Sequence, residues 1–166
     1  MELLLGCGRD HKKRMFIDNK DWTKLTTLDN NRDHKPDVVH DLTQHPLPFE
    51  DNTFTEIHAY EVLEHLAEQG DYKFFFKEFS EYWRILEEGG LFFATVPSRK
   101  SVWALGDPSH KRVFCPEWLT FLQQKEYEIQ VGRTSMSDFR NIYKADFQVV
   151  YLQDDGESFK FGLKKI

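Results

Sequence analysis

The segment that most constrains the fold of this chain is residues 3–8, three leucines followed by Gly-Cys-Gly. Three consecutive leucines are typical of a strand that is buried on both faces, as in the middle of a parallel sheet. Glycines directly after such a strand allow a tight turn and let a ligand approach the backbone. Basic residues from Arg9 to Arg14 then predict a surface helix whose free N–H groups face a polar ligand. An ordinary strand-to-helix turn is the alternative for the glycines alone.

Acidic residues end the next two predicted strands. A strand at 24–28 ends in Asp29, about twenty residues after the glycines, where a dinucleotide-binding fold places a carboxylate on the ribose hydroxyls. A strand at 37–40 ends in Asp41. Ligands of open α/β sheets bind at the carboxyl ends of the strands, so the three strand ends together predict one polar-ligand site. Taken alone, Asp29 could also belong to an Asp-Asn turn that needs no ligand.

The rest of the chain predicts alternating helices and strands. The expected elements are a helix or turn at 14–22, strands at 54–60 and 91–96, helices at 72–88 and 116–125, a polar lid at 127–143, and a hairpin of strands at 147–153 and 158–164. Gly89 and Gly90 are expected to cap the long helix. We therefore expect one α/β domain over residues 1–166, a Rossmann-like three-layer sandwich. Its sheet is mostly parallel and seven-stranded, with an antiparallel C-terminal hairpin.

Composition narrows the class of protein. The chain is 40% hydrophobic and 30% charged, which is typical of a soluble globular domain, and its net charge of −6 argues against a nucleic-acid partner. Cys7 and Cys115 are isolated thiols, which indicates a reducing compartment. No apolar run is long enough to cross a membrane, and the first strand leaves no room for a signal peptide. We expect a cytoplasmic protein without a membrane partner, and the oligomeric state stays open.

Six motifs in this order resemble a known family. They are Leu-Leu-Gly-Cys-Gly at 4–8, Leu-Asp-Asn at 28–30, Asp-Val-Val-His-Asp-Leu at 37–42, Leu-Pro-Phe-Glu-Asp-Asn-Thr-Phe at 47–54, Glu-Val-Leu-Glu-His-Leu at 61–66, and Trp-Arg-Ile-Leu-Glu-Glu-Gly-Gly-Leu at 83–91. As a set, the motifs resemble the class I S-adenosylmethionine-dependent methyltransferases, and within them the small type 11 methyltransferase domains.

The resemblance implies a site for S-adenosylmethionine, and for its product S-adenosylhomocysteine, at the strand ends. The implied contacts are Gly6, Cys7 and Gly8 with the methionine part, Asp29 with the ribose, Asn30 and Asp41 with the adenine, Leu42 beside Asp41, and Glu61 on the methyl side. The implied function is transfer of the methyl group to an unidentified small-molecule acceptor. The sulfonium methyl is already activated, so the protein mainly positions the acceptor.

Three features depart from the family pattern. Leu4 stands where an acid or amide is usual, Asp10 stands where a third glycine is common, and the helix that normally precedes the first strand is missing. These departures favour an alternative function, a non-catalytic S-adenosylmethionine-binding or regulatory module with the same fold. Another nucleotide-binding Rossmann protein is a third possibility, although the glycine turn lacks the third glycine expected for a pyrophosphate.

Histidines supply the candidate for catalysis. His110 lies in the predicted loop 98–114 after the fifth strand, where a substrate would meet the cofactor, and imidazole is a suitable general base near neutral pH. A histidine that only braces the loop is the alternative. Residues 61–65 lack the first histidine of the His-x-x-Glu-His zinc motif, and the seven histidines show no paired ligand spacing. We therefore expect no metal site, and we expect His65 to be structural.

Overall fold

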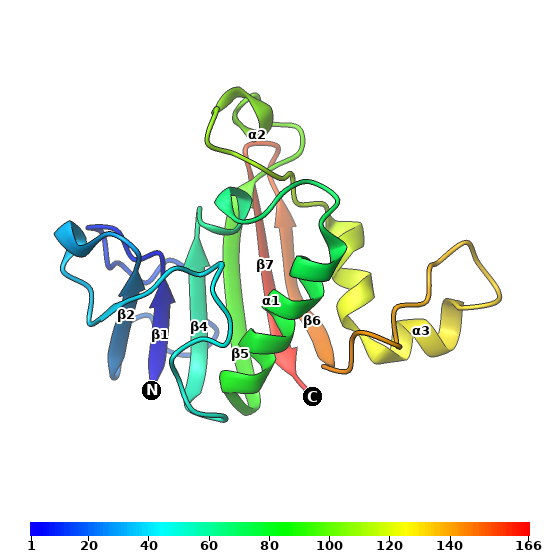
Figure 1. Cartoon of the computed structure of the whole chain (residues 1–166), viewed down its shortest axis with the longest axis horizontal. Helices are drawn as coiled ribbons and strands as arrows, with labels where there is room; N and C mark the ends of the chain where they lie inside the picture. Colours follow the sequence, from blue (N-terminus) through cyan, green and yellow to red (C-terminus); the bar gives the residue numbers. More distant parts are fainter.

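A single sheet of seven strands organises the computed structural model, which describes residues 1–166 (Figure 1). The strands are β1 (Glu2–Leu5), β2 (Leu25–Asp29), β3 (Val38–Val39), β4 (Phe54–Tyr60), β5 (Leu86–Pro97), β6 (Phe147–Asp154) and β7 (Ser158–Lys165). Their order across the sheet is β3-β2-β1-β4-β5-β7-β6. Strands β1 to β5 pair in parallel, and β7 runs antiparallel to both β5 and β6. The predicted sheet and its C-terminal hairpin are confirmed.

The leucine strand β1 lies in the interior of the sheet, between β2 and β4. Leu3, Leu4 and Leu5 are all buried, and Leu4 is in register with Thr27 on one side and His58 on the other. Because the neighbouring strands run parallel, the chain leaves β1, β2 and β4 at the same edge. In Figure 1 this is the upper edge, where the loop carrying the short helix α2 (Trp103–Gly106) also lies.

Aromatic residues build the main core between the sheet and the helices α1 (Tyr72–Ile85), η3 (Pro116–Leu122) and α3 (Gln124–Gln130). Figure 1 shows α1 passing in front of the lower part of β5 and then of β7 and β6, with α3 beside β6. Asp71 caps α1 by accepting the N–H of Phe74 at 3.0 Å, as a helix start requires. Tyr82 of α1 stacks on Phe92 of β5 with ring centroids 4.8 Å apart. The remaining short helices are η1 (Arg32–His34) and η2 (Leu63–His65).

The end of α1 differs from the prediction that two glycines cap it. The helix ends at Ile85, and Gly89 and Gly90 lie within β5. The ladder between β4 and β5 shifts there, so that the glycines belong to a bulge. Gly89 has a φ of +73°, and a Cβ on Gly90 would lie 2.8 Å from the carbonyl oxygen of Glu87. The glycines are therefore needed for the close approach within the bulge, while the helix ends through Leu86 in extended conformation.

The predicted polar lid or insertion at 127–143 is held by a buried tyrosine at each end, while most of the residues between them are exposed. The predicted helix at 116–125 is divided into a 3₁₀ helix and the α-helix α3. Tyr127 and Tyr143 are fully buried, and the hydroxyl of Tyr143 donates to the carbonyl of Leu122 at 3.3 Å. Both tyrosines therefore anchor this region in the core.

No helix follows β1, so the expected surface helix is wrong. The chain between β1 and β2 is irregular, and its Met15 packs with Leu4 and Phe93 on the second face of the sheet. The hydroxyl of Tyr60 accepts the backbone N–H groups of Arg14 at 3.1 Å and Met15 at 3.2 Å. These N–H groups thus find a side-chain partner without helix formation. Residues 14–22 form neither the expected helix nor a regular turn, but irregular chain with bends.

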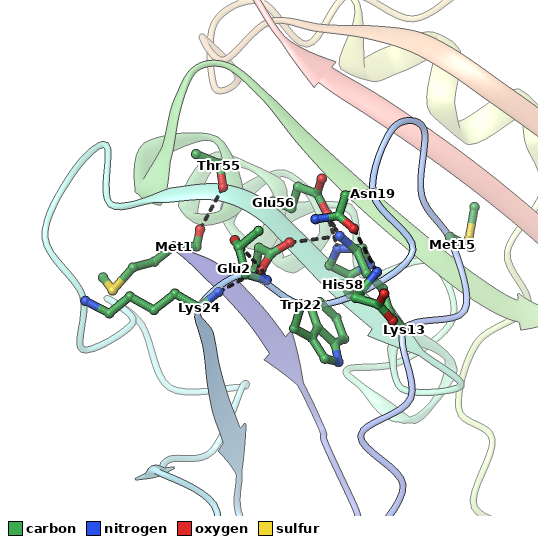
Figure 2. Close-up of polar contacts among 12 residues, drawn as sticks. Met1, Glu2, Lys13, Met15, Asn19, Trp22, Lys24, Thr55, Glu56 and His58 are labelled. Atoms are coloured by element: carbon green, nitrogen blue, oxygen red, sulfur yellow. Dashed lines mark hydrogen bonds and ion pairs between the residues drawn. The ribbon is translucent and has the colours of Figure 1, made fainter.

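A buried ionic network lies under this irregular segment (Figure 2). The ammonium of Lys13 lies 2.8 Å from a carboxylate oxygen of Glu2 and 2.6 Å from one of Glu56, and its side chain is 1% exposed. His58 lies 2.9 Å from Glu56, and the ring of Trp22 meets the His58 ring edge-on. Charged groups from β1 and β4 therefore fasten this segment to the sheet.

The acid stability of the protein is expected to depend on Glu2. Burial raises the pKa of Glu2, but the Lys13 ammonium and the N–H groups of Thr23 and Lys24 outweigh it and lower the pKa from 4.5 to about 2. A carboxyl with a depressed folded-state pKa stabilises the fold above its unfolded pKa, and that stability is lost as the pH falls toward 2. We expect protonation of Glu2 to lower the free energy of unfolding by about 3 kcal/mol between pH 4.5 and about pH 2.

Urea denaturation of wild type and Glu2→Gln from pH 7 to about pH 2 measures this dependence. We expect the variant to be less stable at pH 7 and to lose less stability on acidification. Asp138→Asn is a matched control, because the pKa of Asp138 is also lowered to about 2 but its side chain is 41% exposed. An equally steep acid loss in wild type and Glu2→Gln would contradict the assignment.

The structure contains no helix with the length and apolar character that crossing a membrane requires.

Candidate functional site

The ends of β1, β2, β3 and β4 open onto one pocket of about 270 Å³. Of the residues predicted for the cofactor, those that line it are Gly6, Asp29, Asn30, Asp41, Leu42 and Glu61. Cys7 and Gly8 line an adjoining pocket of about 200 Å³ that shares Gly6. The fold thus brings all eight predicted residues to one edge of the sheet, although they are spread from position 6 to position 61.

The turn after β1 needs a glycine at position 6. Gly6 has a φ of +55°, which is rare for any other residue, and a Cβ there would lie 2.5 Å from Cγ2 of Val62. Val62 follows Glu61, which itself turns in the left-handed region with a φ of 55°. The turns after β1 and β4 therefore approach each other closely, and both Gly6 and Val62 line the larger pocket.

Asp29 joins the turn after β1 to the turn after β2. Its carboxylate accepts the N–H of Gly8 at 2.9 Å and the N–H of Asn31 at 2.8 Å, and Nδ1 of His34 lies 3.1 Å away. Burial raises the pKa of Asp29, but these donors outweigh it, so the net pKa is lowered. Because a carboxylate offers about four lone-pair positions, one stays available for a ligand hydroxyl.

The other predicted cofactor residues differ in burial and in their hydrogen bonds. Asp41 accepts the N–H and the hydroxyl of Thr43 with one oxygen, both at 2.8 Å, which lowers its pKa. Asn30 is exposed and Leu42 is buried. Cys7 is buried in the small core on the second face of the sheet, together with Leu4, Met15, Tyr60 and Phe93. Its N–H donates to the carbonyl of Leu28 at 3.1 Å.

Sequence reasoning did not bring together Glu64, His65 and His110, which form a cluster next to the pocket. Nε2 of His65 and Nε2 of His110 lie 3.9 Å and 4.0 Å from the same carboxylate oxygen of Glu64. Burial raises the pKa of Glu64 to about 8, and the nearby Glu61 carboxylate contributes to the rise. The spacing Glu-x-x-Glu-His at 61–65 was the one visible signal, because His110 arrives only through folding.

Comparison with known proteins decides the family. The family model described as "Methyltransferase domain" matches residues 5–94, more than half of the chain. The chain belongs to the methyltransferase-domain family. It is a class I domain of the kind that uses S-adenosylmethionine, as the six motifs implied. Among curated proteins, none matches this sequence significantly.

Solved structures share the fold of this methyltransferase domain at low sequence identity. A methyltransferase from Archaeoglobus fulgidus is 17% identical with a TM-score of 0.59, over 99% of this chain and 85% of that chain. A chain from the complex of the Haloferax volcanii Trm112 methyltransferase activator with its methyltransferase partner is 14% identical with a TM-score of 0.64, over 99% and 81%. The [4+2]-cyclase SpnF is 14% identical with a TM-score of 0.60, over 99% and 74%.

A second buried ion pair holds the loop after β5 in this methyltransferase domain. The guanidinium of Arg112 donates to both carboxylate oxygens of Glu78 at 2.9 and 2.8 Å, and its Nε donates to the carbonyl of Leu63 at 2.7 Å. The N–H of Lys111 donates to the carbonyl of Glu64 at 2.8 Å. The loop that carries His110 is therefore fastened to η2 by Lys111 and Arg112, and to α1 by Arg112.

Proposed function

We propose that this domain binds S-adenosylmethionine in the pocket at the strand ends and transfers its methyl group to a small-molecule acceptor. The observation that carries the proposal is the pocket itself, where Asp29, Asp41 and Glu61 from three different strand ends face one space beside the glycine turn. Its acids suit the hydroxyls and the amino group of an adenosine.

Each residue has a proposed task in binding. Gly6, Cys7 and Gly8 lie beside the methionine part, and the absence of a side chain at Gly6 keeps the two turns in contact. Asp29 accepts from a ribose hydroxyl with its remaining lone pair. The other proposed contacts are Asn30 beside the adenine, the free oxygen of Asp41 on the adenine amino group, Leu42 next to it, and Glu61 toward the methyl group.

Methyl transfer requires few catalytic groups from the protein. The cofactor supplies an activated methyl group, so the protein holds the acceptor in line and excludes competing nucleophiles. A base is needed only where the acceptor is an alcohol or a protonated amine. We propose His110 for that task, because it belongs to the cluster of Glu64, His65 and His110 beside the pocket.

A non-catalytic binding module is the second candidate. Leu4, at the position where the family usually has an acid or amide, lines the pocket beside the glycine turn, and SpnF shows that the fold also occurs in a protein named as a cyclase rather than as a methyltransferase. This candidate predicts cofactor binding without formation of S-adenosylhomocysteine from any acceptor. Incubation of the protein and S-adenosylmethionine with a panel of hydroxy, amino and carboxy acceptors distinguishes the two.

Calorimetric titration with S-adenosylhomocysteine tests the ribose contact of Asp29. Asp29→Ala is expected to weaken binding by about 1.5–3 kcal/mol for each charge-assisted bond lost. Asp29→Asn keeps an acceptor for the N–H of Gly8, so it isolates the loss of charge from the loss of the turn. Asp33→Asn, an exposed position in η1 outside the pocket, is the control with unchanged affinity. A folded Asp29→Ala protein with wild-type affinity would exclude the ribose role.

A further inference from the structure

The cluster of Glu64, His65 and His110 has a buried carboxylate without a partner. Glu64 is 2% exposed, and neither of its carboxylate oxygens accepts a hydrogen bond. The buried cation Arg112 donates to Glu78 and to the carbonyl of Leu63, and it donates no hydrogen bond to the carboxyl group of Glu64. A buried carboxyl group without hydrogen bonds is costly in either protonation state, so a group that would satisfy its oxygens belongs at this position.

Both imidazoles of the cluster are oriented by backbone carbonyls. Nδ1 of His110 lies 2.8 Å from the carbonyl oxygen of Trp103, and Nδ1 of His65 lies 3.2 Å from that of Ser109. A carbonyl only accepts, so each Nδ1 carries the proton and each Nε2 keeps its lone pair. These Nε2 atoms are the ones that face Glu64. Histidine ligands of metal ions are typically held by a partner on the other ring nitrogen in this way.

We propose that Glu64, His65 and His110 bind one divalent first-row transition-metal ion. Two neutral imidazoles and one carboxylate are a donor set that suits ions such as Zn²⁺, Co²⁺ and Mn²⁺ better than the oxygen-preferring Mg²⁺ or Ca²⁺. The three ligand atoms lie within 4.8 Å of one another. Around an ion bound at about 2.0–2.1 Å they would be roughly 3.3 Å apart, so only small side-chain movements close the site.

Backbone hydrogen bonds hold the two segments of this site together. The carbonyl of Glu64 accepts the N–H groups of Lys111 and Arg112 at 2.8 and 3.2 Å, and the carbonyl of Leu63 accepts Nε of Arg112. The ligands therefore come from a preorganised pair of loops. The site also adjoins the cofactor pocket, because His65 and Glu61 line it. An ion there has open positions for water or for an oxygen of a bound molecule.

Metal titration of the full chain, freed of metal by chelation and without S-adenosylmethionine, tests the proposal. Co²⁺ is followed by its visible absorption, Zn²⁺ and Mg²⁺ by calorimetry, and the melting temperature is recorded with each ion. We expect one Co²⁺ or Zn²⁺ per chain and a higher melting temperature with the ion. Glu64→Gln and His110→Gln are each expected to weaken binding by at least about tenfold. His40→Gln, in the pocket wall but outside the cluster, keeps wild-type binding.

Several outcomes would overturn the site. They are the lack of stoichiometric Co²⁺ or Zn²⁺ binding, binding of Mg²⁺ alone, or wild-type affinity in both Glu64→Gln and His110→Gln. His65→Gln gives a third ligand variant where one of the others fails to fold, as judged by far-UV circular dichroism. Because no cofactor is present, these results do not depend on S-adenosylmethionine binding, although a bound ion would occupy the Nε2 of His110 that the proposed base needs.

Discussion

Replacing Arg112 by methionine is expected to lower the free energy of unfolding by about 3–5 kcal/mol. Arg112 and Glu78 are almost completely inaccessible, with side chains 2% and 0% exposed. Removal of the guanidinium leaves the Glu78 carboxylate buried without a counter-charge, with only the hydroxyl of Tyr82 still donating to it at 3.0 Å. It also removes the bond from Nε to the carbonyl of Leu63, which fixes η2.

A double variant separates the buried charge from the lost packing. In Arg112→Met with Glu78→Gln, the residue left behind is a neutral amide that still accepts from Tyr82, so we expect it to be more stable than Arg112→Met alone. Arg99→Met removes an exposed pair with Glu117 and is expected to cost less than about 1 kcal/mol. Chemical denaturation measures all four proteins. A double variant less stable than the single one would show that the buried charge is not the source of the loss.

His110→Ala is expected to reduce methyl transfer by roughly 10²–10⁴-fold where the acceptor must lose a proton. Affinity for S-adenosylhomocysteine should stay close to that of wild type, because a base acts on the acceptor and the adenosine contacts lie elsewhere in the pocket. The two quantities are measured as formation of S-adenosylhomocysteine and as calorimetric affinity. Equal losses in both would show that His110 shapes the pocket.

His110→Asn tests the bracing role of the same side chain. Asparagine can keep a hydrogen bond to the carbonyl of Trp103 but cannot act as a base. Activity retained in this variant would contradict the assignment of His110 as the base. The ligand role inferred above uses the same Nε2, and a metal-bound nitrogen has no lone pair for a proton. The metal titrations therefore decide between the two roles without an acceptor.

The sheet was predictable because its signals are local. Residues 3–5 form an unbroken apolar run, Asp29 is the last residue of β2, and Asp41 lies two residues after the end of β3. Chain direction then places these ends at one edge, which was enough to predict the pocket. The hairpin at the C-terminus follows from the Asp-Gly turn at 155–156.

The differences arise where tertiary contacts override local preference. The basic run after Gly8 is helix-compatible, but Lys13 is drawn into the ionic network with Glu2, and Tyr60 satisfies the backbone of the next two residues. Gly89 and Gly90 are typical of a helix cap, yet the pairing of β5 with β4 uses them for a bulge. Nothing local in the sequence indicates such contacts.

The cluster of Glu64, His65 and His110 was not predictable from the sequence for a different reason. Glu64 and His65 are adjacent, but His110 is 46 and 45 residues away from them and meets them only because the loop after β5 folds back onto η2. A search for metal ligands at a fixed spacing in the sequence cannot find a site whose ligands come from two segments that are far apart in the chain.

A crystal structure of the protein soaked with S-adenosylhomocysteine tests whether the pocket at the strand ends is the cofactor site. We expect density for the whole of S-adenosylhomocysteine in this pocket. A ribose hydroxyl would lie within hydrogen-bond distance of Asp29, the adenine near Asp41, and the sulfur would face Glu61. Density for the cofactor at another place on the molecule, or an empty pocket at saturating concentration, would contradict it.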